Sequence, residues 1–166
     1  MEDIGPEKKS FPPLVGAGTR VLVLGSLPGE VSLRRGEYYA NPRNRFWDLV
    51  GALIEQPVPP LYEERVGLIQ AAGIGLWDVV RSARRKGSLD AAIRGHVVNP
   101  LGELARRLPS LQAVAFNGQK ASKIGRAELI DVLPGDKLID LPSSSPAHTM
   151  AFNAKLDAWL KLRRYL

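Results

Sequence analysis

The 166-residue chain contains no cysteine and only two histidines, His96 and His148. The lack of thiols excludes disulfide bonds, thiolate catalysis and cysteine-ligated zinc or iron–sulfur sites. Two histidines are too few for the usual protein-ligated catalytic zinc, so we expect a function without a bound metal. No apolar run approaches the length of a membrane span, and no signal peptide is evident at the N-terminus. These absences predict a cytoplasmic protein that has no membrane partner.

Acidic side chains are in the minority, since 17 Asp and Glu stand against 23 Lys and Arg, a formal net charge of +6. A basic balance favours a polyanionic partner, although charge alone identifies none. The hydrophobic share of 45% is ordinary for a globular protein, and the length fits one domain with a buried core. We expect that single domain over residues 20–166, with residues 1–19 forming a leader packed on it.

Short apolar runs alternate with helical patterns along the chain. The runs predict buried strands at 21–24, 74–80, 111–116 and 137–141. Helical spacing and capping residues predict helices from 46, from 60 or 61, over 88–93, from 99, over 120–127 and from 152. Strands that alternate with helices predict an α/β fold, here a three-layer α/β/α sandwich around a central four-stranded, mostly parallel sheet. The arginine-rich segment 81–87 is expected to form a basic loop.

The most informative stretch covers residues 20–47. Its strand ends at Gly25, and Ser26-Leu27-Pro28-Gly29 follows as a tight turn. A loop at the carboxyl end of a buried strand is where open α/β sheets bind ligands. The next segment, YYANPRNR at 38–45, is too specific in composition for a solvated connector. It leads into a helix whose first turn Asn44 can cap.

Three motifs follow one another at domain-scale separation: GSLPGEVS at 25–32, YYANPRNRFW at 38–47 and LPSSSPAH at 141–148. Together they resemble the uracil-DNA glycosylase superfamily, and in particular its branch of hypoxanthine (deoxyinosine) DNA glycosylases. The resemblance covers the chain from the first strand to the last helix. It implies a four-stranded sheet between helical layers and a monofunctional DNA glycosylase of base excision repair. Such an enzyme hydrolyses the N-glycosidic bond of a deaminated base that has been flipped out of DNA.

The residue that positions the hydrolytic water is the main question left by this resemblance. Many superfamily members use an Asn or Asp of the first loop, a place that Leu27 takes here. In the hypoxanthine branch an Asn of the NPRN segment is implicated, which points to Asn44, with Asn41 as the alternative. A side-chain amide holds a water but cannot take its proton at neutral pH, so leaving-group stabilisation must contribute more. Asn44 can also be a plain helix cap, or combine the two roles.

The base itself needs a pocket, which we expect where the loops after the strands converge on one edge of the sheet. Tyr38 and Tyr39 can offer a face on which the flipped base stacks, or can pack in the core. Asn117 can hydrogen-bond to the base edge, or only accept the backbone angles of the turn before Gly118. Asp78, at a strand end, can orient water or a loop. With the GSLPG loop, these residues form the predicted base-binding set.

The SSSPAH segment resembles the second superfamily motif, which grips phosphate and supports the departing base. Hydroxyls and backbone amides of Ser143, Ser144 and Ser145 suit phosphate oxygens, and Ser145 is also a catalytic candidate. In some relatives a His begins the motif, whereas here His148 ends it, which weakens the transfer of a leaving-group role. Met150 lies where relatives insert an apolar wedge into the duplex. The arginines expected to contact DNA are Arg43, Arg45, Arg84 and Arg85.

Two other functions stay open from the sequence. One is the same chemistry on uracil, because no residue proves a purine-sized pocket; the other is a non-catalytic nucleic-acid-binding α/β module. GSLPG has neither the spacing of a dinucleotide site nor that of a P-loop, so we expect no small-molecule cofactor. The motifs hold no lysine placed as a Schiff-base nucleophile, which predicts hydrolysis without strand cleavage. We expect a monomer whose partner is DNA that contains a deaminated base.

Overall fold

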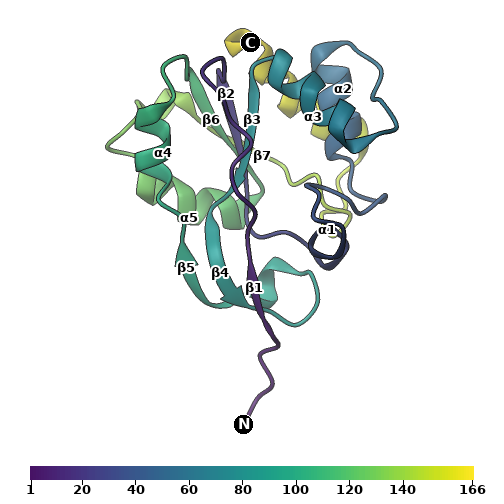
Figure 1. Ribbon diagram of the computed structural model, residues 1–166, viewed down its shortest axis with the longest axis vertical. Helices are drawn as coiled ribbons and strands as arrows, with labels where there is room; N and C mark the ends of the chain where they lie inside the picture. The colour runs from purple at the N-terminus through teal and green to yellow at the C-terminus, as the bar shows by residue number, and fades with distance from the viewer.

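The computed structural model describes all residues, 1–166, and its centre is a four-stranded sheet (Figure 1). The strands are β2 (Val21–Gly25), β3 (Ile74–Asp78), β6 (Ala113–Asn117) and β7 (Leu138–Leu141). All neighbours pair in parallel, in the order β3-β2-β6-β7. Every residue of β2, β3 and β6 is buried, which explains why these strands are continuous apolar runs. The predicted four-stranded parallel sheet is confirmed.

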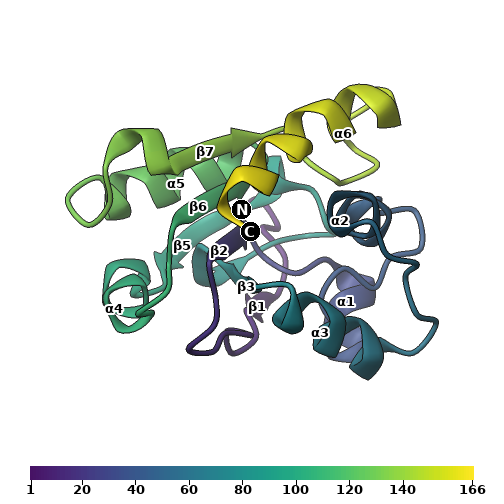
Figure 2. The same cartoon turned by 90° about the horizontal axis from the view of Figure 1, so that it is seen from above.

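Helices cover both faces of this sheet. They are α1 (Glu30–Arg35), α2 (Phe46–Ile54), α3 (Tyr62–Ala71), α4 (Leu101–Arg107), α5 (Gln119–Leu129) and α6 (Phe152–Trp159), with short 3-10 helices η1 (Asp90–Ala92), η2 (Gly135–Lys137) and η3 (Leu160–Tyr165). Val21 and Val23 pack in one core with residues of α2, α3 and α6. Leu22 and Leu24 pack in a second core with residues of α4 and α5. Side chains of β2 therefore alternate between two cores, and Figure 2 shows the two helical layers on opposite sides. The predicted three-layer sandwich is confirmed.

A second sheet, antiparallel and three-stranded, does not follow from the sequence patterns. β1 (Glu7–Lys9) pairs with β4 (Val80–Arg84), and β4 pairs with β5 (Arg94–Val98). The expectation of a basic loop over 81–87 is therefore wrong, because most of that segment is strand. Only Val80 and Ala83 of β4 are buried, and register shifts interrupt its period of two, so the sequence shows no strand pattern.

The polar residues at two of the expected helix starts, Asn99 and Ser88, suggest caps that the structure does not show. Asn99 does not cap α4; its Nδ2 donates to the backbone oxygen of Asp78 at 2.7 Å. Ser88 does not cap η1; its Oγ accepts from the backbone N–H of Glu30 at 3.0 Å. Both polar side chains join segments that are distant in sequence. Local sequence patterns do not contain that information.

The N-terminal segment lies along both sheets. β1 extends the small sheet, and Leu14 forms an isolated bridge with Leu76 of the large one. The indole Nε1 of Trp77 donates to the backbone oxygen of Phe11 at 2.9 Å. None of the helices combines the length and the apolar composition that crossing a membrane requires.

Candidate active site

A pocket of about 360 Å³ lies at the carboxyl ends of β2, β3 and β6. This volume falls in the range of about 300–1,000 Å³ that small-molecule sites occupy. The strands are parallel, so their carboxyl ends and the loops that follow meet at one edge of the sheet. The predicted catalytic and base-binding residues all line this pocket: Gly25, Ser26, Leu27, Pro28, Gly29, Tyr38, Tyr39, Asn41, Asn44, Asp78, Asn117, Ser145 and His148.

The absence of a side chain at Gly25 shapes the floor of the pocket. A Cβ at this position would lie 2.6 Å from Oδ1 of Asp78 and 3.0 Å from the hydroxyl oxygen of Tyr39. Atoms do not approach so closely without displacement, so any larger residue would push both polar groups away. Glycine is needed here for close approach rather than for an unusual backbone angle.

Asp78 is buried at the end of β3, where its side chain is only 4% exposed. Its Oδ2 has no hydrogen-bond partner. Burial, with a further contribution from the negative charge of Asp90, raises the pKa of Asp78 to about 7, although Arg85 acts in the opposite direction. Removing a carboxyl from water disfavours its charged form, and no contacting cation compensates. Asp78 therefore changes its protonation state near neutral pH.

Asp90 lines the same pocket from η1, and sequence reasoning did not place it there. Its Oδ1 accepts a hydrogen bond from the hydroxyl of Ser26 at 2.5 Å. The sequence suggests only a structural carboxylate near a helix N-terminus. Its contact with the GSLPG loop depends on the small antiparallel sheet, which brings β4 and η1 beside that loop.

Asn117 joins the second and third motifs. Its Nδ2 donates to Oγ of Ser144 at 2.9 Å and to the hydroxyl oxygen of Tyr39 at 3.2 Å. Its Oδ1 accepts from the backbone N–H of Ser144 at 2.9 Å. The left-handed turn is made by Gly118, with φ of 102°, and not by Asn117. Because its amide is occupied by these contacts, the structure favours a positioning role for Asn117.

The two tyrosines differ in their surroundings. Tyr38 is 4% exposed, and its hydroxyl donates to the backbone oxygen of Pro12 at 2.9 Å. Tyr39 has a left-handed backbone, with φ of 53°, and its ring stacks on Phe46 at a centroid distance of 3.9 Å. Burial raises the pKa of both phenols, so both stay protonated. The structure favours core packing for Tyr38 and leaves Tyr39 as the aromatic candidate at the pocket.

Asn41 and Asn44 both form turns with their own backbone. Oδ1 of Asn44 accepts from the N–H of Phe46, the first residue of α2, at 3.0 Å. Oδ1 of Asn41 accepts from the N–H of Arg43, also at 3.0 Å. An amide oxygen has two acceptor sites and the amide nitrogen two donors, so capping α2 and holding a water are compatible.

The serine loop is fixed by contacts with the rest of the site. The backbone oxygen of Ser144 accepts from the N–H of Arg45 at 3.0 Å, which links the second and third motifs. The backbone oxygen of Ser145 accepts from Nζ of Lys155 at 3.1 Å. Lys155 is only 3% exposed, and burial lowers its pKa. Sequence reasoning missed it, although its place between Phe152 and Trp159 puts it on the buried face of α6.

Comparisons with known proteins agree with this geometry. A family model, that of the Uracil DNA glycosylase superfamily, matches residues 12–165. The chain belongs to the uracil DNA glycosylase superfamily.

Relatives within this superfamily cover nearly the whole chain. A protein of Methanosarcina barkeri (strain Fusaro) named Hypoxanthine DNA glycosylase is 36% identical over 92% of this chain and 96% of its own length. A protein of Methanosarcina acetivorans with the same name is 35% identical over 95% of this chain and 99% of its own length. The solution NMR structure of a candidate uracil DNA glycosylase from M. acetivorans superimposes with a TM-score of 0.80 at 34% identity, covering 96% of this chain and 98% of that one.

Two residues predicted to bind the DNA substrate of this glycosylase superfamily are buried. Arg85 is 0% exposed, and its guanidinium donates to the backbone oxygens of Gly87 at 2.8 Å, Leu27 at 3.4 Å and Pro28 at 2.5 Å. Ser144 is 1% exposed, and its polar groups bond to neighbouring residues. The burial and the internal hydrogen bonds of both side chains argue against a direct contact with phosphate. Arg85 instead holds the GSLPG loop against β4.

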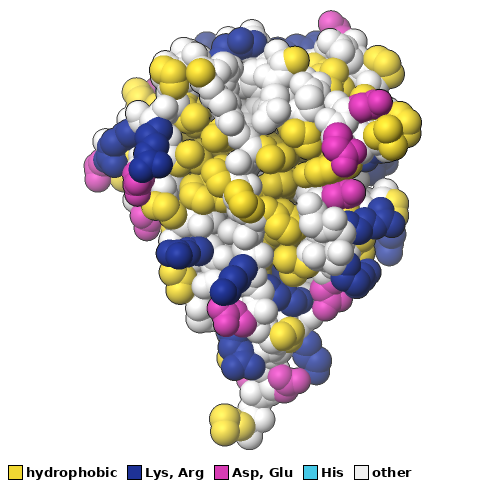
Figure 3. Space-filling model, viewed as in Figure 1, with side chains coloured by type: hydrophobic (Ala, Val, Ile, Leu, Met, Phe, Trp, Pro, Cys, Tyr) yellow, Lys and Arg dark blue, Asp and Glu magenta, His cyan; other side chains and the backbone are white.

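The other predicted DNA contacts are accessible on this glycosylase domain. Arg43 is exposed, Arg45 is exposed with its Nε 2.8 Å from Oδ2 of Asp48, and Met150 is 44% exposed. Arg84 is exposed too, but its Nε donates to the backbone oxygen of Gly5 at 2.7 Å. Figure 3 shows basic and acidic side chains interspersed around a central apolar area, so the face in that view is not uniformly basic. No group of three or more His, Asp or Glu side chains is placed to hold a metal ion.

Proposed function

We propose that this chain is a monofunctional DNA glycosylase that removes a deaminated base, with hypoxanthine preferred, from a nucleotide flipped out of DNA. The observation that carries the proposal is the single pocket in which all three superfamily motifs meet. Two relatives named Hypoxanthine DNA glycosylase, alike over nearly the full chain, support the choice of base. We further propose that it works as a cytoplasmic monomer without a cofactor.

The enzyme has two tasks in this reaction, to position a water and to stabilise the departing base. Cleavage of the C1′–N bond passes through an oxocarbenium-like sugar, so a water must be held near C1′ and the departing base must be stabilised. We assign the water to Asn44, with Asn41 as the alternative, because both line the pocket from the second motif. Neither amide can remove the proton of that water. Stabilisation of the leaving base therefore carries more of the catalysis, with Ser145 and His148 as its candidates on the third motif.

Binding of the duplex falls to accessible groups beside the pocket. Ser143 and Ser145 line the pocket and are half-buried, and their hydroxyls and amides suit phosphate oxygens. Arg43 and Arg45 supply positive charge from the second motif. We assign to Met150, which is 44% exposed, the role of filling the space that the extruded nucleotide leaves in the stack.

The direct experiment uses the purified full-length protein on duplexes that contain inosine, uracil, xanthine or no lesion. We expect free hypoxanthine and alkali-labile abasic sites from inosine, without added metal or nucleotide and in the presence of a chelator. Loss of activity in EDTA with recovery on a divalent metal would contradict the metal-free mechanism. Trapping of an enzyme–DNA adduct by borohydride would show a lyase, and binding without base release from any duplex would show a non-catalytic module.

A further inference from the structure

The floor of the pocket holds a carboxyl group without a partner. Asp78 is 4% exposed, its Oδ2 makes no hydrogen bond, and its Oδ1 borders the space left open by Gly25. Buried polar groups are nearly always hydrogen-bonded, and an exception inside a pocket calls for a ligand or a proton. Asp78 lines the pocket, where a ligand can bind, and its raised pKa lets it carry a proton.

The charged and titratable groups around Asp78 do not offer it an ion pair. From η1, Asp90 adds a second negative charge nearby. From the end of β4, Arg85 attracts Asp78, but its guanidinium donors are bonded to backbone oxygens. From the second motif, Tyr38 and Tyr39 present neutral phenols, whose raised pKa values reflect burial and the nearness of Asp78. A carboxyl in such surroundings favours its neutral form.

We propose that Asp78, carrying its proton, donates a hydrogen bond to the exocyclic carbonyl oxygen of the flipped deaminated base. This inference deepens the proposed function and rests on it. Deamination replaces an exocyclic amino donor with a carbonyl acceptor, as at C6 when adenine becomes hypoxanthine. A protonated carboxyl has the O–H donor that a carbonyl needs, whereas an ionised carboxylate can only accept and would favour the amino group instead.

The same hydrogen bond assists bond cleavage. As the C1′–N bond breaks, its electron pair stays with the base, and part of the charge reaches the carbonyl oxygen. The water oxygen bonds to C1′, and the proton that this water loses ends, by way of solvent, on the departing base, which leaves as neutral hypoxanthine. The proton of Asp78 stays on its carboxyl while the hydrogen bond strengthens. A donor preorganised toward developing charge stabilises the transition state more than the ground state.

The first test is the pH dependence of single-turnover release of hypoxanthine. The wild-type rate should fall roughly tenfold between about pH 6 and pH 8, as the acid form of Asp78 is lost. Asp78→Asn keeps a donor that does not ionise, so this decline should disappear. Asp90→Asn removes a negative charge, so the decline should move to lower pH. An unchanged decline in Asp78→Asn would overturn the proposal.

The second test removes the acceptor from the substrate. Two duplexes carry nucleotides that a 2′-fluoroarabino sugar protects from cleavage, one with hypoxanthine and one with purine, which lacks the carbonyl. At about pH 6, Asp78→Ala should weaken binding of the hypoxanthine duplex about tenfold or more and leave the purine duplex unchanged. Equal weakening of both would overturn the proposal. The two affinities are compared within one protein preparation, so a reduced folded fraction does not affect their ratio.

Failure of the parent proposal is distinguishable from failure of this one. Wild-type protein that releases no base from any lesion would refute the glycosylase itself. Wild-type protein that releases hypoxanthine, with Asp78 variants affecting both duplexes equally, would refute only the donor role.

Discussion

The floor and the rim of the pocket are built from residues in different environments. On the floor, Asp78 and Asn117 end strands, Ser144 lies in the loop after β7, and all three are at most 7% exposed. On the rim, Asn44 is half-buried and His148 is exposed, and local turns hold both. Polar groups interact strongly in a desolvated site, where an unpaired one is also costly. Stability and base recognition are therefore coupled on the floor, whereas rim residues offer substitutions, such as Asn44→Asp, that change chemistry while the local turn is kept.

The largest expected effect concerns the floor and depends on pH. The raised pKa of Asp78, about 7, means that the native state keeps a proton that the unfolded chain releases near pH 4. The contribution of this group is fully present below the unfolded pKa and is lost as pH rises through 7, by at most about 4 kcal/mol. Asp78→Asn does not ionise, so it should resist urea better than wild type at pH 8. The difference should shrink toward pH 4.

A matched control for this measurement is Asp157→Asn, which alters an exposed carboxylate of α6. It should leave the pH dependence of stability unchanged. If Asp78→Asn and wild type keep the same stability difference at both pH values, Asp78 is ionised in the native state across this range.

On the rim, the largest effect should be catalytic. Asn44→Ala should lower single-turnover excision at least about a hundredfold, or roughly 2.7 kcal/mol in barrier, with lesion binding preserved. It also removes the bond to the N–H of Phe46, which costs about 0.5–2 kcal/mol of stability. Asn44→Asp keeps an acceptor for that N–H, so its melting temperature should stay near wild type. Should folded Asn44→Ala work near the wild-type rate while Asn41→Ala does not, the water-positioning role belongs to Asn41.

The next effect is a loss of stability when a floor residue is changed, compared with a change at an exposed position of α5. Asn117→Ala removes the partners of the N–H and hydroxyl of Ser144, which stay buried, at a cost of about 2 kcal/mol. Release of hypoxanthine should fall with it, because the third motif loses its anchor. The neighbouring Gln119→Ala, exposed at the start of α5, should change the free energy of unfolding by less than about 0.5 kcal/mol. Equal stabilities for the two variants would show that the contacts of Asn117 contribute nothing measurable.

The sequence predicts the parallel sheet well and the small sheet not at all, for a physical reason. Strands buried on both faces are uninterrupted apolar runs, which single-sequence patterns detect. β5, with the sequence RGHVV, is exposed along nearly its whole length, and β4 carries the exposed Arg81 and Arg84 beside its two buried residues. These strands form through pairing with one another and with β1, a tertiary effect that local composition does not reveal.

The residues of the site also divide into those that the sequence predicts and those that it does not. The motif residues follow strand ends, so chain order together with parallel topology places them in one pocket. The burial of Arg85 could not be predicted, because it depends on backbone oxygens that a distant loop brings to its guanidinium. The burial of Lys155 has a signal in the helical spacing of Phe152, Lys155 and Trp159, although the backbone oxygen that it contacts comes from a distant loop. Charged residues are almost never fully buried unless they are paired, which makes exposure the natural expectation for both.

The smallest expected effect tests the outer part of the rim. Arg43→Glu and Arg45→Glu should each weaken DNA binding a few-fold, whatever the base, and lower the salt slope by about one. Arg43 has the freer side chain, since Arg45 also pairs with Asp48 and lies 4.2 Å from the ring centroid of Phe152. We therefore expect the larger loss for Arg43→Glu.

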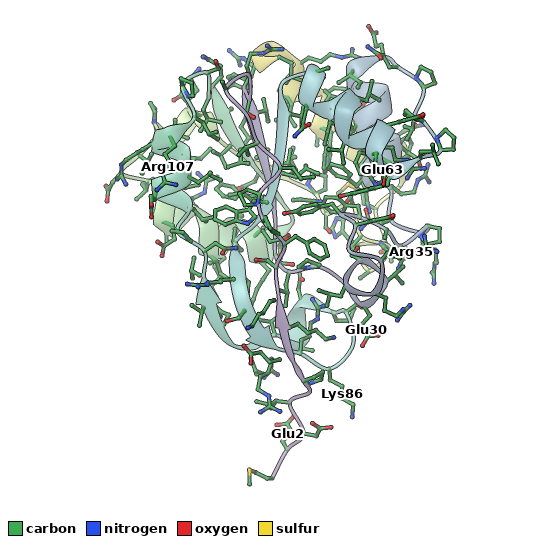
Figure 4. The ribbon with its side chains drawn as sticks, in the orientation of Figure 1. Glu2, Glu30, Arg35, Glu63, Lys86 and Arg107 are labelled. Carbon is green, nitrogen blue, oxygen red and sulfur yellow. The ribbon has the colours of Figure 1, made fainter.

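The matched control is Arg107→Glu, because Figure 4 places Arg107 on α4, across the molecule from Arg35 on α1 and away from the pocket loops. All three variants change the net charge equally, so long-range attraction to DNA falls by a similar amount in each. Only a direct phosphate contact lowers binding further. If Arg107→Glu weakens binding as much as Arg43→Glu, the rim arginines act through net charge alone. A rim variant that alters the preference for hypoxanthine over uracil would break the comparison itself, because recognition would then extend beyond the buried floor.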